Sequence, residues 1–318
     1  MVAQTRMPKQ TELELLFWAR QTEWHRYWTE QHDRHSYNEL CHYTDASGLE
    51  GILRSRRSWA THIDYLNDRA ELRYAHSLIR ERIREREQAR KGTALEPYLH
   101  DTLELFSLFD EHLDVYVACF CESDDLLSQW RAYGAAGGGY AVCISPKLVE
   151  GATYTGSPPK IYLRRVLYDQ TEQIDFLEAA LDAACHALLD AQEKYPDSAA
   201  KSLAILFHGT IRVLMLDCLW CFKSSVFSEE REWRFGYVCR RGDLSDVQFR
   251  TSRGNIIPYV PLDLSRLATK DRATIAINKI VHGPTLEPKL AKQSLEWLAA
   301  KLEYKNIEIA GSKVPLRL

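Results

Sequence analysis

Apolar residues recur along this chain with two spacings, one of about 3.6 residues and one of about two residues. The longer spacing predicts helices at residues 12–31, 46–54, 68–91, 97–109, 170–193, 198–222 and 289–302. Short runs rich in β-branched and aromatic residues predict strands. These lie at residues 39–43, 59–61, 115–121, 139–144, 161–168, 232–239, 247–250, 256–260, 275–281 and 307–309.

The predicted strands occur in every third of the chain, with helices inserted between them, and no repeat or low-complexity linker separates them. This order favours an α+β fold. We expect an N-terminal helical extension over residues 1–38, followed by a single α+β domain over residues 39–318. A helical insertion of about residues 170–222 interrupts that domain. The aromatic residues of the N-terminal helix make it a candidate for self-association or for contact with a protein partner.

Composition narrows the class of protein. Of the 318 residues, 45% are hydrophobic and 27% are charged, as in globular proteins, and the formal charge is −3. No overall basic field indicates a dedicated nucleic-acid-binding protein. A local basic rim for phosphates is an alternative to ordinary surface charge for Arg54, Arg56, Arg57, Arg240, Arg241, Arg250 and Arg253. The N-terminus lacks a signal-peptide core and the apolar stretch 213–222 is short, so we expect a cytoplasmic protein without a membrane span.

Most of the eight cysteines lie within apolar runs, such as the run from Val117 to Cys121. Buried, reduced thiols are therefore the favoured interpretation. Cys218 and Cys221 have the spacing of metal ligands, but no second pair follows them. A zinc site needs about four ligands, so zinc binding and thiol redox chemistry are the lesser alternatives.

The triplet His42-Tyr43-Thr44 ends the first predicted strand. On a strand, His42 and Thr44 share one face and Tyr43 lies on the other. An imidazole beside a hydroxyl is suited to hydrogen bonding a ribose or a carboxamide. The alternative is a strand end whose histidine is satisfied locally.

Two further clusters follow. Tyr65 precedes Asn67 and Asp68, and Asp68 with Glu71 has the spacing of a capping box at a helix start. The same loop residues would also be able to project into a site. Trp130 and Tyr133 share a helix face before a glycine-rich loop, an arrangement suited either to the core or to stacking on a planar ring.

The fourth cluster leads from Lys223 into a late strand, on which Glu230, Glu232 and Arg234 share one face at a spacing of two. A plain charged strand facing solvent is one interpretation. The other is a carboxylate site that stabilises a developing positive charge.

In this order, the four clusters resemble a widespread bacterial family known only as a domain of unknown function, whose members are similar to the ADP-ribosyltransferase fold. The segments 280–284 and 314–317 extend the resemblance. It implies an ADP-ribosyltransferase-like split β-sheet core with helical insertions, and NAD as substrate. It also implies that His42 and Thr44 hold the ribose and the nicotinamide amide. Glu230 or Glu232 would hydrogen bond the nicotinamide ribose. The remaining cofactor-binding residues would be Tyr43, Tyr65, Asn67, Asp68, Trp130, Tyr133 and Arg234, with one of the aromatic residues stacked on the nicotinamide.

Cleavage of the nicotinamide–ribose bond generates an oxocarbenium-like centre, which a fixed carboxylate stabilises. The expected function is therefore an NAD-dependent ADP-ribosyltransferase, of the toxin or anti-phage defence type, that modifies a cellular protein or nucleic acid. The alternatives are an NAD glycohydrolase, a metal-dependent nuclease or hydrolase, and a non-catalytic nucleotide sensor. No resident metal ion is expected for the leading function.

Overall fold

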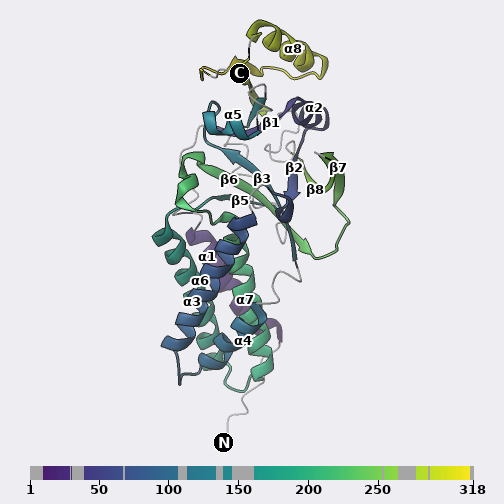
Figure 1. Ribbon diagram of the computed structural model, residues 1–318. Coiled ribbons are helices and arrows are strands. Elements are labelled where there is room, and N and C mark those ends of the chain that lie inside the picture. Colours follow the sequence, from purple (N-terminus) through teal and green to yellow (C-terminus); the bar gives the residue numbers. More distant parts are fainter. Residues whose placement is uncertain are drawn as a thin grey trace, which may run out of the picture. The chain divides into compact units, whose positions relative to one another are not determined.

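The structure is a computed structural model that describes residues 10–28, 30, 39–66, 69–106, 113–133, 139–144, 161–252, 254–263, 277–285 and 287–315 (Figure 1). The chain divides into two compact units. The helical unit comprises Met1–His35, Asp68–Leu113 and Leu167–Val226. The sheet unit comprises Ser36–Asn67, Asp114–Val166 and Phe227–Leu318. Each unit therefore collects segments that are far apart in the sequence.

The helical unit contains α1 (Gln10–Trp28), α3 (Arg69–Ala89), α4 (Glu96–Phe106), α6 (Gln170–Lys194) and α7 (Ala200–Cys221). Helix α1 packs against α6 and α7. Its buried face includes Trp24 and Trp28, whose rings meet Phe176 of α6 at centroid distances of 4.8 and 4.3 Å. Trp24 and Trp28 thus belong to the core of this unit, whereas Trp18 and Tyr27 of the same helix are exposed.

Helix α7 is longer than the apolar stretch noted in the sequence. Among the described helices, it is the one long and apolar enough to cross a membrane by length and composition. Its most apolar stretch is 50% buried, and α7 contacts the other helices of its unit.

The sheet unit is built on one 10-stranded sheet in the order β10-β9-β4-β1-β3-β2-β8-β7, with β6 paired to β3 and β5 paired to β6. The strands are β1 (Leu40–Thr44), β2 (Arg57–His62), β3 (Leu113–Cys121), β4 (Tyr140–Ile144), β5 (Ile161–Arg165), β6 (Glu232–Arg240), β7 (Gln248–Ser252), β8 (Asn255–Asp263), β9 (Ile277–His282) and β10 (Glu308–Gly311). The helical elements are α2 (Ala46–Ser55), η2 (Ile63–Tyr65), α5 (Leu127–Tyr133), η6 (Ser225–Glu230) and α8 (Pro288–Lys301). The β9–β10 pair is parallel, whereas β4 is antiparallel to β1 and β9. The predicted mixed α+β class is therefore confirmed, with an open mixed sheet.

Strand β3 has three partners. Its contacts with β6 extend along its length. They run from the hydrogen bond of the Cys239 thiol to the Asp114 carbonyl to the hydrogen bond of the Trp233 ring to the Glu122 carboxylate. The pairings with β1 and β2 involve different parts of β3. The β1 pairing is at Cys121 and the β2 pairing begins at Val117. We call the stretch of β3 between these two pairings the branch point.

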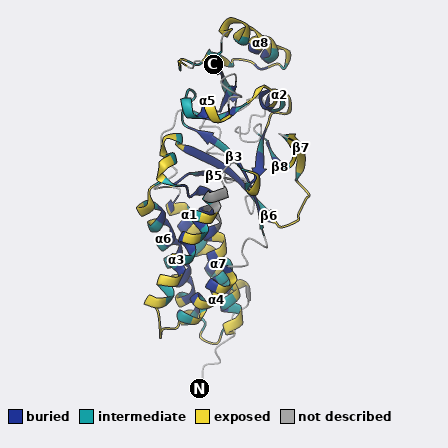
Figure 2. Ribbon diagram, viewed as in Figure 1, coloured by how far each residue is buried: buried dark blue, intermediate teal, exposed yellow. Residues whose placement is uncertain are grey.

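Each face of the sheet carries its own apolar cluster. One cluster combines strand residues such as Leu40, Phe120 and Phe235 with residues of α2 and α8. The other combines Cys41, Tyr43, Cys121, Ala141, Cys143 and Val281 with Trp130 of α5. Figure 2 shows the resulting burial along β3 and β2. Alternate residues of β1 therefore belong to opposite faces, as its pleat requires.

Cys41 and Cys143 form a disulfide, so the expectation of reduced thiols is wrong for this pair. The other six cysteines are free. The bonded residues are 102 positions apart in the sequence and become direct neighbours because β1 pairs with β4. A strand pairing of this kind is not readable from cysteine spacing.

Candidate functional site

His42 lies beside the branch point. Its Nδ1 atom donates a hydrogen bond of 2.7 Å to the carbonyl of Cys119, which lies between the β1 and β2 pairings. Because a carbonyl can only accept, Nδ1 carries the proton and Nε2 of the neutral ring is an acceptor. Burial lowers the pKa of His42, the Cys119 carbonyl opposes this, and the charge of Arg250 lowers the pKa further. The imidazole is therefore held neutral in one tautomer.

Arg250 of β7 supplies a cation near this imidazole. Its Nη2 atom donates to the Thr61 hydroxyl at 2.9 Å, and its guanidinium lies 5.2 Å from the centre of the Trp59 ring. The Nε atom is buried without a hydrogen-bond partner. Burial lowers the pKa of Arg250, although Tyr259 and Asp45 oppose the shift. Among the residues that the structure describes, none forms an ion pair with Arg250.

Three more residues surround the guanidinium. Trp59 is half-buried, and its ring meets Tyr259 at a centroid distance of 5.3 Å. Asp45 caps α2 by accepting from the Gly48 amide at 2.8 Å, and this bond lowers the pKa of Asp45, with a further contribution from Arg250. The half-buried Thr44 packs on the same glycine, where a Cβ atom would lie 2.0 Å from the Thr44 hydroxyl.

We define the branch-point site as the group that combines these residues with the neutral histidine: His42, Thr44, Asp45, Trp59, Thr61 and Arg250. The group offers an under-satisfied cation, an aromatic ring, a hydroxyl and a fixed hydrogen-bond acceptor. Such a set is suited to an anion attached to a planar ring.

Tyr43 and Trp130 lie on the opposite face from His42. The Tyr43 hydroxyl donates to the Ser123 carbonyl and accepts from the Leu126 amide, at 3.0 and 2.9 Å. Burial raises the pKa of Tyr43. Trp130 is fully buried, and its ring lies edge-on to Tyr43 at 4.6 Å. Both residues therefore serve as packing residues, and neither is placed to stack on a ligand beside His42.

Tyr133 and Tyr65 are the other two aromatic candidates. Tyr133 ends α5 and is 44% exposed, so its ring is not enclosed by the core. Tyr65 is 49% exposed and lies edge-on to His62 at 5.9 Å. Trp59, which the sequence analysis did not select, is the aromatic residue in contact with Arg250.

The glutamate cluster also lies apart from His42. Arg234 donates two hydrogen bonds to Glu232, at 2.8 and 2.9 Å, and both side chains are buried. Trp233, which alternates with them on β6, belongs to the apolar cluster of Leu40. Glu232 and Glu230 contribute to the raised pKa of Cys121, so they lie towards the Cys121 face. The structure brings Glu230, Glu232 and Arg234 near one another, but not to the imidazole of His42.

The loop cluster before α3 is only partly visible. Asn67 and Asp68 lie outside the described residues, as does most of the glycine run at 134–138. Glu71 belongs to the helical unit and forms an ion pair with Lys223 at 2.9 Å, with both side chains nearly buried. Glu71 therefore has a structural partner within its own unit.

A metal site is the remaining chemical possibility. Within the described part of the chain, the group of side chains close enough to hold an ion is Glu39, Cys41 and Cys143. It contains none of the residues that would build the site of a metal-dependent hydrolase, and its sulfur atoms are bonded to each other. Those residues would be His42, Asp68, Glu71, Glu230 and Glu232. The described residues thus give no support to that alternative.

Residues 129–235 match a family described as a protein of unknown function (DUF2971). No curated protein and no solved structure matches the chain significantly. The DUF2971 match begins beside Trp130 and ends after Arg234, so it contains two of the four clusters found in the sequence. His42 and Arg250 lie outside the DUF2971 match, and the residues within it have mainly structural contacts. The match therefore assigns neither a reaction nor the branch-point site.

Sequence reasoning identified His42 and Thr44 but missed Trp59 and Thr61. Arg250 appeared only as one member of a possible basic rim. A tryptophan in a short strand directly after a basic turn was the available signal for Trp59. No spacing rule relates it to Arg250, which lies 191 positions later in the sequence.

Proposed function

We propose that the branch-point site binds NAD and that the protein is an ADP-ribosyltransferase-like enzyme. The environment of Arg250 supports this proposal most directly. Its guanidinium is desolvated and has no carboxylate partner among the described residues. A partly desolvated cation without an ion-pair partner is costly, and a bound phosphate reduces the cost through charge-assisted hydrogen bonds.

The other residues of the branch-point site contact the remaining parts of the dinucleotide. The pyrophosphate lies at the guanidinium of Arg250, and an aromatic ring of NAD stacks against Trp59. The Nε2 atom of His42 accepts from a ribose hydroxyl, while Thr44 contributes a second hydroxyl contact. A neutral histidine is required for this role, and the lowered pKa of His42 meets the requirement.

The proposed reaction breaks the bond between nicotinamide and ribose. Nicotinamide leaves as a neutral molecule, and the positive charge that develops on the ribose needs a fixed carboxylate. We assign this carboxylate to Asp45 rather than to Glu232. The pKa of Asp45 is lowered and its charge is felt at Arg250, whereas Glu232 is engaged by Arg234. The acceptor is a cellular protein or nucleic acid, as in a toxin or defence effector.

The decisive experiment compares NAD binding by the wild type, Arg250→Gln and Arg240→Gln. Arg240 is an exposed arginine at the end of β6 and serves as the matched control. Loss of hydrogen bonds between a charged group and phosphate costs about 1.5–3 kcal/mol, which corresponds to a roughly 10- to 150-fold rise in Kd. Isothermal titration calorimetry with NAD and with ADP-ribose measures this rise. Equal affinity in wild type and Arg250→Gln would refute the site.

Nicotinamide release then identifies the reaction. Release that persists in a chelator and is lost in Asp45→Asn supports ADP-ribosyl transfer, and Glu230→Gln tests the alternative carboxylate. Release without incorporation of ADP-ribose into any acceptor identifies an NAD glycohydrolase. Tight NAD binding with no release identifies a nucleotide sensor. Metal-dependent cleavage of nucleic acid, with no NAD bound, would overturn the proposal.

A further inference from the structure

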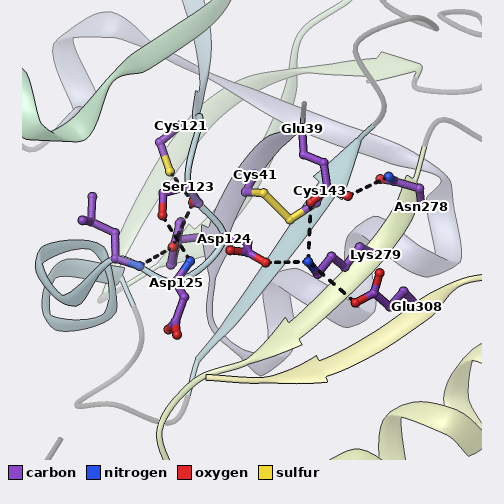
Figure 3. Close-up of a disulfide and its surroundings, with 12 residues drawn as sticks. Glu39, Cys41, Cys121, Ser123, Asp124, Asp125, Cys143, Asn278, Lys279 and Glu308 are labelled. Carbon is purple, nitrogen blue, oxygen red and sulfur yellow. Dashed lines mark hydrogen bonds and ion pairs between the residues drawn. A yellow bond between two sulfur atoms is a disulfide. The ribbon is translucent and has the colours of Figure 1, made fainter. Parts of the chain in front are cut away.

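A row of five side chains crosses five strands on one face of the sheet (Figure 3). From β3 to β10 these are Cys121, Cys41, Cys143, Lys279 and Glu308, each the register partner of the next. Cys41 is central to the sulfur part of the row because it has a cysteine directly opposite on both sides. It is bonded to Cys143, with Cα atoms 4.0 Å apart, and Cys121 is free.

The charges around this disulfide are mainly negative. Lys279 lies 2.6 Å from Asp124, 3.6 Å from Glu39 and 3.7 Å from Glu308. The Glu39 carboxylate lies within 4.8 Å of both sulfur atoms of the disulfide. One ammonium therefore faces several carboxylates. These surroundings disfavour thiolates, because each thiolate would add another negative charge, so the reduced pair would carry two neutral thiols.

Cys121 is the nearest candidate for internal disulfide exchange, since it is the second neighbour of Cys41. Its thiol donates to the Ser123 carbonyl at 3.0 Å. Burial raises the pKa of Cys121 to about 12, although that hydrogen bond opposes the shift. The thiolate is the attacking species in exchange, so Cys121 is inert at neutral pH. The bond consequently stays between Cys41 and Cys143.

The disulfide is also next to the branch-point site. Cys41 precedes His42 on β1, and its partner Cys143 lies on β4 directly opposite. Two unbonded sulfur atoms need roughly 3.5–4 Å between them, like other non-bonded heavy atoms. Breaking the bond therefore requires the sulfur atoms to move apart within a buried, close-packed cluster. Such a movement displaces the residues next to Cys41, including His42.

We propose that the Cys41–Cys143 disulfide is a redox-responsive staple that sets the position of His42. A dithiol reductant is the reacting partner. One thiolate of the reductant attacks a sulfur of the disulfide, forming a mixed disulfide and releasing the other cysteine as a thiolate that takes up a proton. The second thiolate of the reductant then displaces the first cysteine. The reductant leaves as a cyclic disulfide, and the protein keeps two thiols. The effect of the disulfide on the position of His42 follows from the geometry of β1. Only the expected change in NAD affinity rests on the proposed function.

The first test counts thiols in the full-length protein purified without reductant. Alkylation after denaturation modifies the six free cysteines, and prior treatment with dithiothreitol raises the number to the total of eight. Peptide mapping places the additional label on Cys41 and Cys143. Labelling of all eight cysteines before reduction would overturn the proposal. Because the disulfide is buried, samples are brought to equilibrium in the redox buffer before alkylation.

The second test follows the His42 ring by nuclear magnetic resonance, with the ring signal assigned from the spectrum of His42→Gln. Reduction of the wild type shifts the signal, and reoxidation restores it, so no substitution is needed for the main result. Cys121→Ser is the matched control, which keeps the disulfide and responds as the wild type does. In Cys41→Ala/Cys143→Ala the signal no longer responds to dithiothreitol.

NAD affinity is measured in both redox states of the same samples. We expect reduction to raise the Kd about fivefold, the equivalent of one ordinary hydrogen bond. A shifted His42 signal with no NAD binding in either state would refute the proposed function and leave the staple intact. NAD binding with an unchanged His42 signal after reduction would refute the staple and leave the function intact.

Discussion

The disulfide allows a stability prediction whose size follows from the structure. Cys41 and Cys143 are 102 positions apart, so the bond closes a long loop in the unfolded chain. The chain-entropy model assigns such a loop about 4.7 kcal/mol of stabilisation at 25 °C, and measured values are more often about 2–4 kcal/mol. Reduction leaves the β1–β4 register without its covalent link, and the apolar cluster around it unchanged in composition. We therefore expect reduction to lower the free energy of unfolding of the sheet unit by about 2–5 kcal/mol.

Hydrogen exchange measured by mass spectrometry is the suitable assay, because a chain with two units need not unfold in one step. Peptides covering β1 and β4 should lose protection by a factor of about 30 or more on reduction, which is the equivalent of at least 2 kcal/mol. Peptides from α6 report the helical unit and supply the internal control. Cys185→Ser, which removes a free buried thiol of α6, should not alter the response of β1. Equal protection of β1 in the oxidised and reduced protein would refute the loop-entropy reasoning.

Three further predictions concern individual side chains. Trp130→Phe keeps the affinity for NAD, because Trp130 lies on the face opposite His42. It lowers the free energy of unfolding in urea by about 1–3 kcal/mol, because the smaller ring leaves buried space and cannot donate to Asp125. The pKa of His42 is lowered in the folded state. The stability that this shift contributes is therefore fully present above about pH 6.5, and it falls as the pH drops below that value. Between pH 7.5 and 5.5, the free energy of unfolding measured with urea should fall less in His42→Gln than in the protein that keeps His42. Both proteins carry His208→Gln, because the pKa of His208 is lowered as well. Lys223→Met lowers the free energy of unfolding by about 3–5 kcal/mol because it removes the cation paired with the nearly buried Glu71, and the double substitution with Glu71→Leu restores part of it.

The sequence was informative wherever a periodic pattern alone decides the structure. The alternation around His42 predicted that His42 and Tyr43 lie on opposite faces of a strand. Tyr43 belongs to one apolar cluster, whereas the ring of His42 lies 5.4 Å from that of Phe120, which belongs to the other. The α+β class followed from the order of helical and extended patterns. The division of the chain into domains stays a prediction, although α1 packs with α6 and α7 rather than lying alone.

What the sequence did not reveal depends on strand pairing. The branch point exists because β1 and β2 pair with different parts of β3, and no local pattern specifies which strands are neighbours. The disulfide depends on the register between β1 and β4 in the same way. The predicted pocket of His42 with Glu232 assumed that two strands present these residues to the same side. Their order along the chain contains no information about that side.

Two cations of this protein, the buried Lys223 and the half-buried Arg250, show how a structural charge differs from one that is available for binding. Lys223 lies against Glu71 at 2.9 Å, so its charge is balanced when the protein is alone. Arg250 contacts a hydroxyl and an aromatic ring, neither of which carries a negative charge, and its Nε atom has no hydrogen-bond partner. The carboxylate that influences it most, Asp45, already accepts bonds that cap α2. A bound phosphate would give this guanidinium charge-assisted hydrogen bonds that partial contact with water does not replace. Arg250 would not have to give up an ion pair with a described residue, as Lys223 would. The balance of charge around each cation, rather than the number of arginines in the sequence, is therefore the reason for proposing the branch-point site as the nucleotide site.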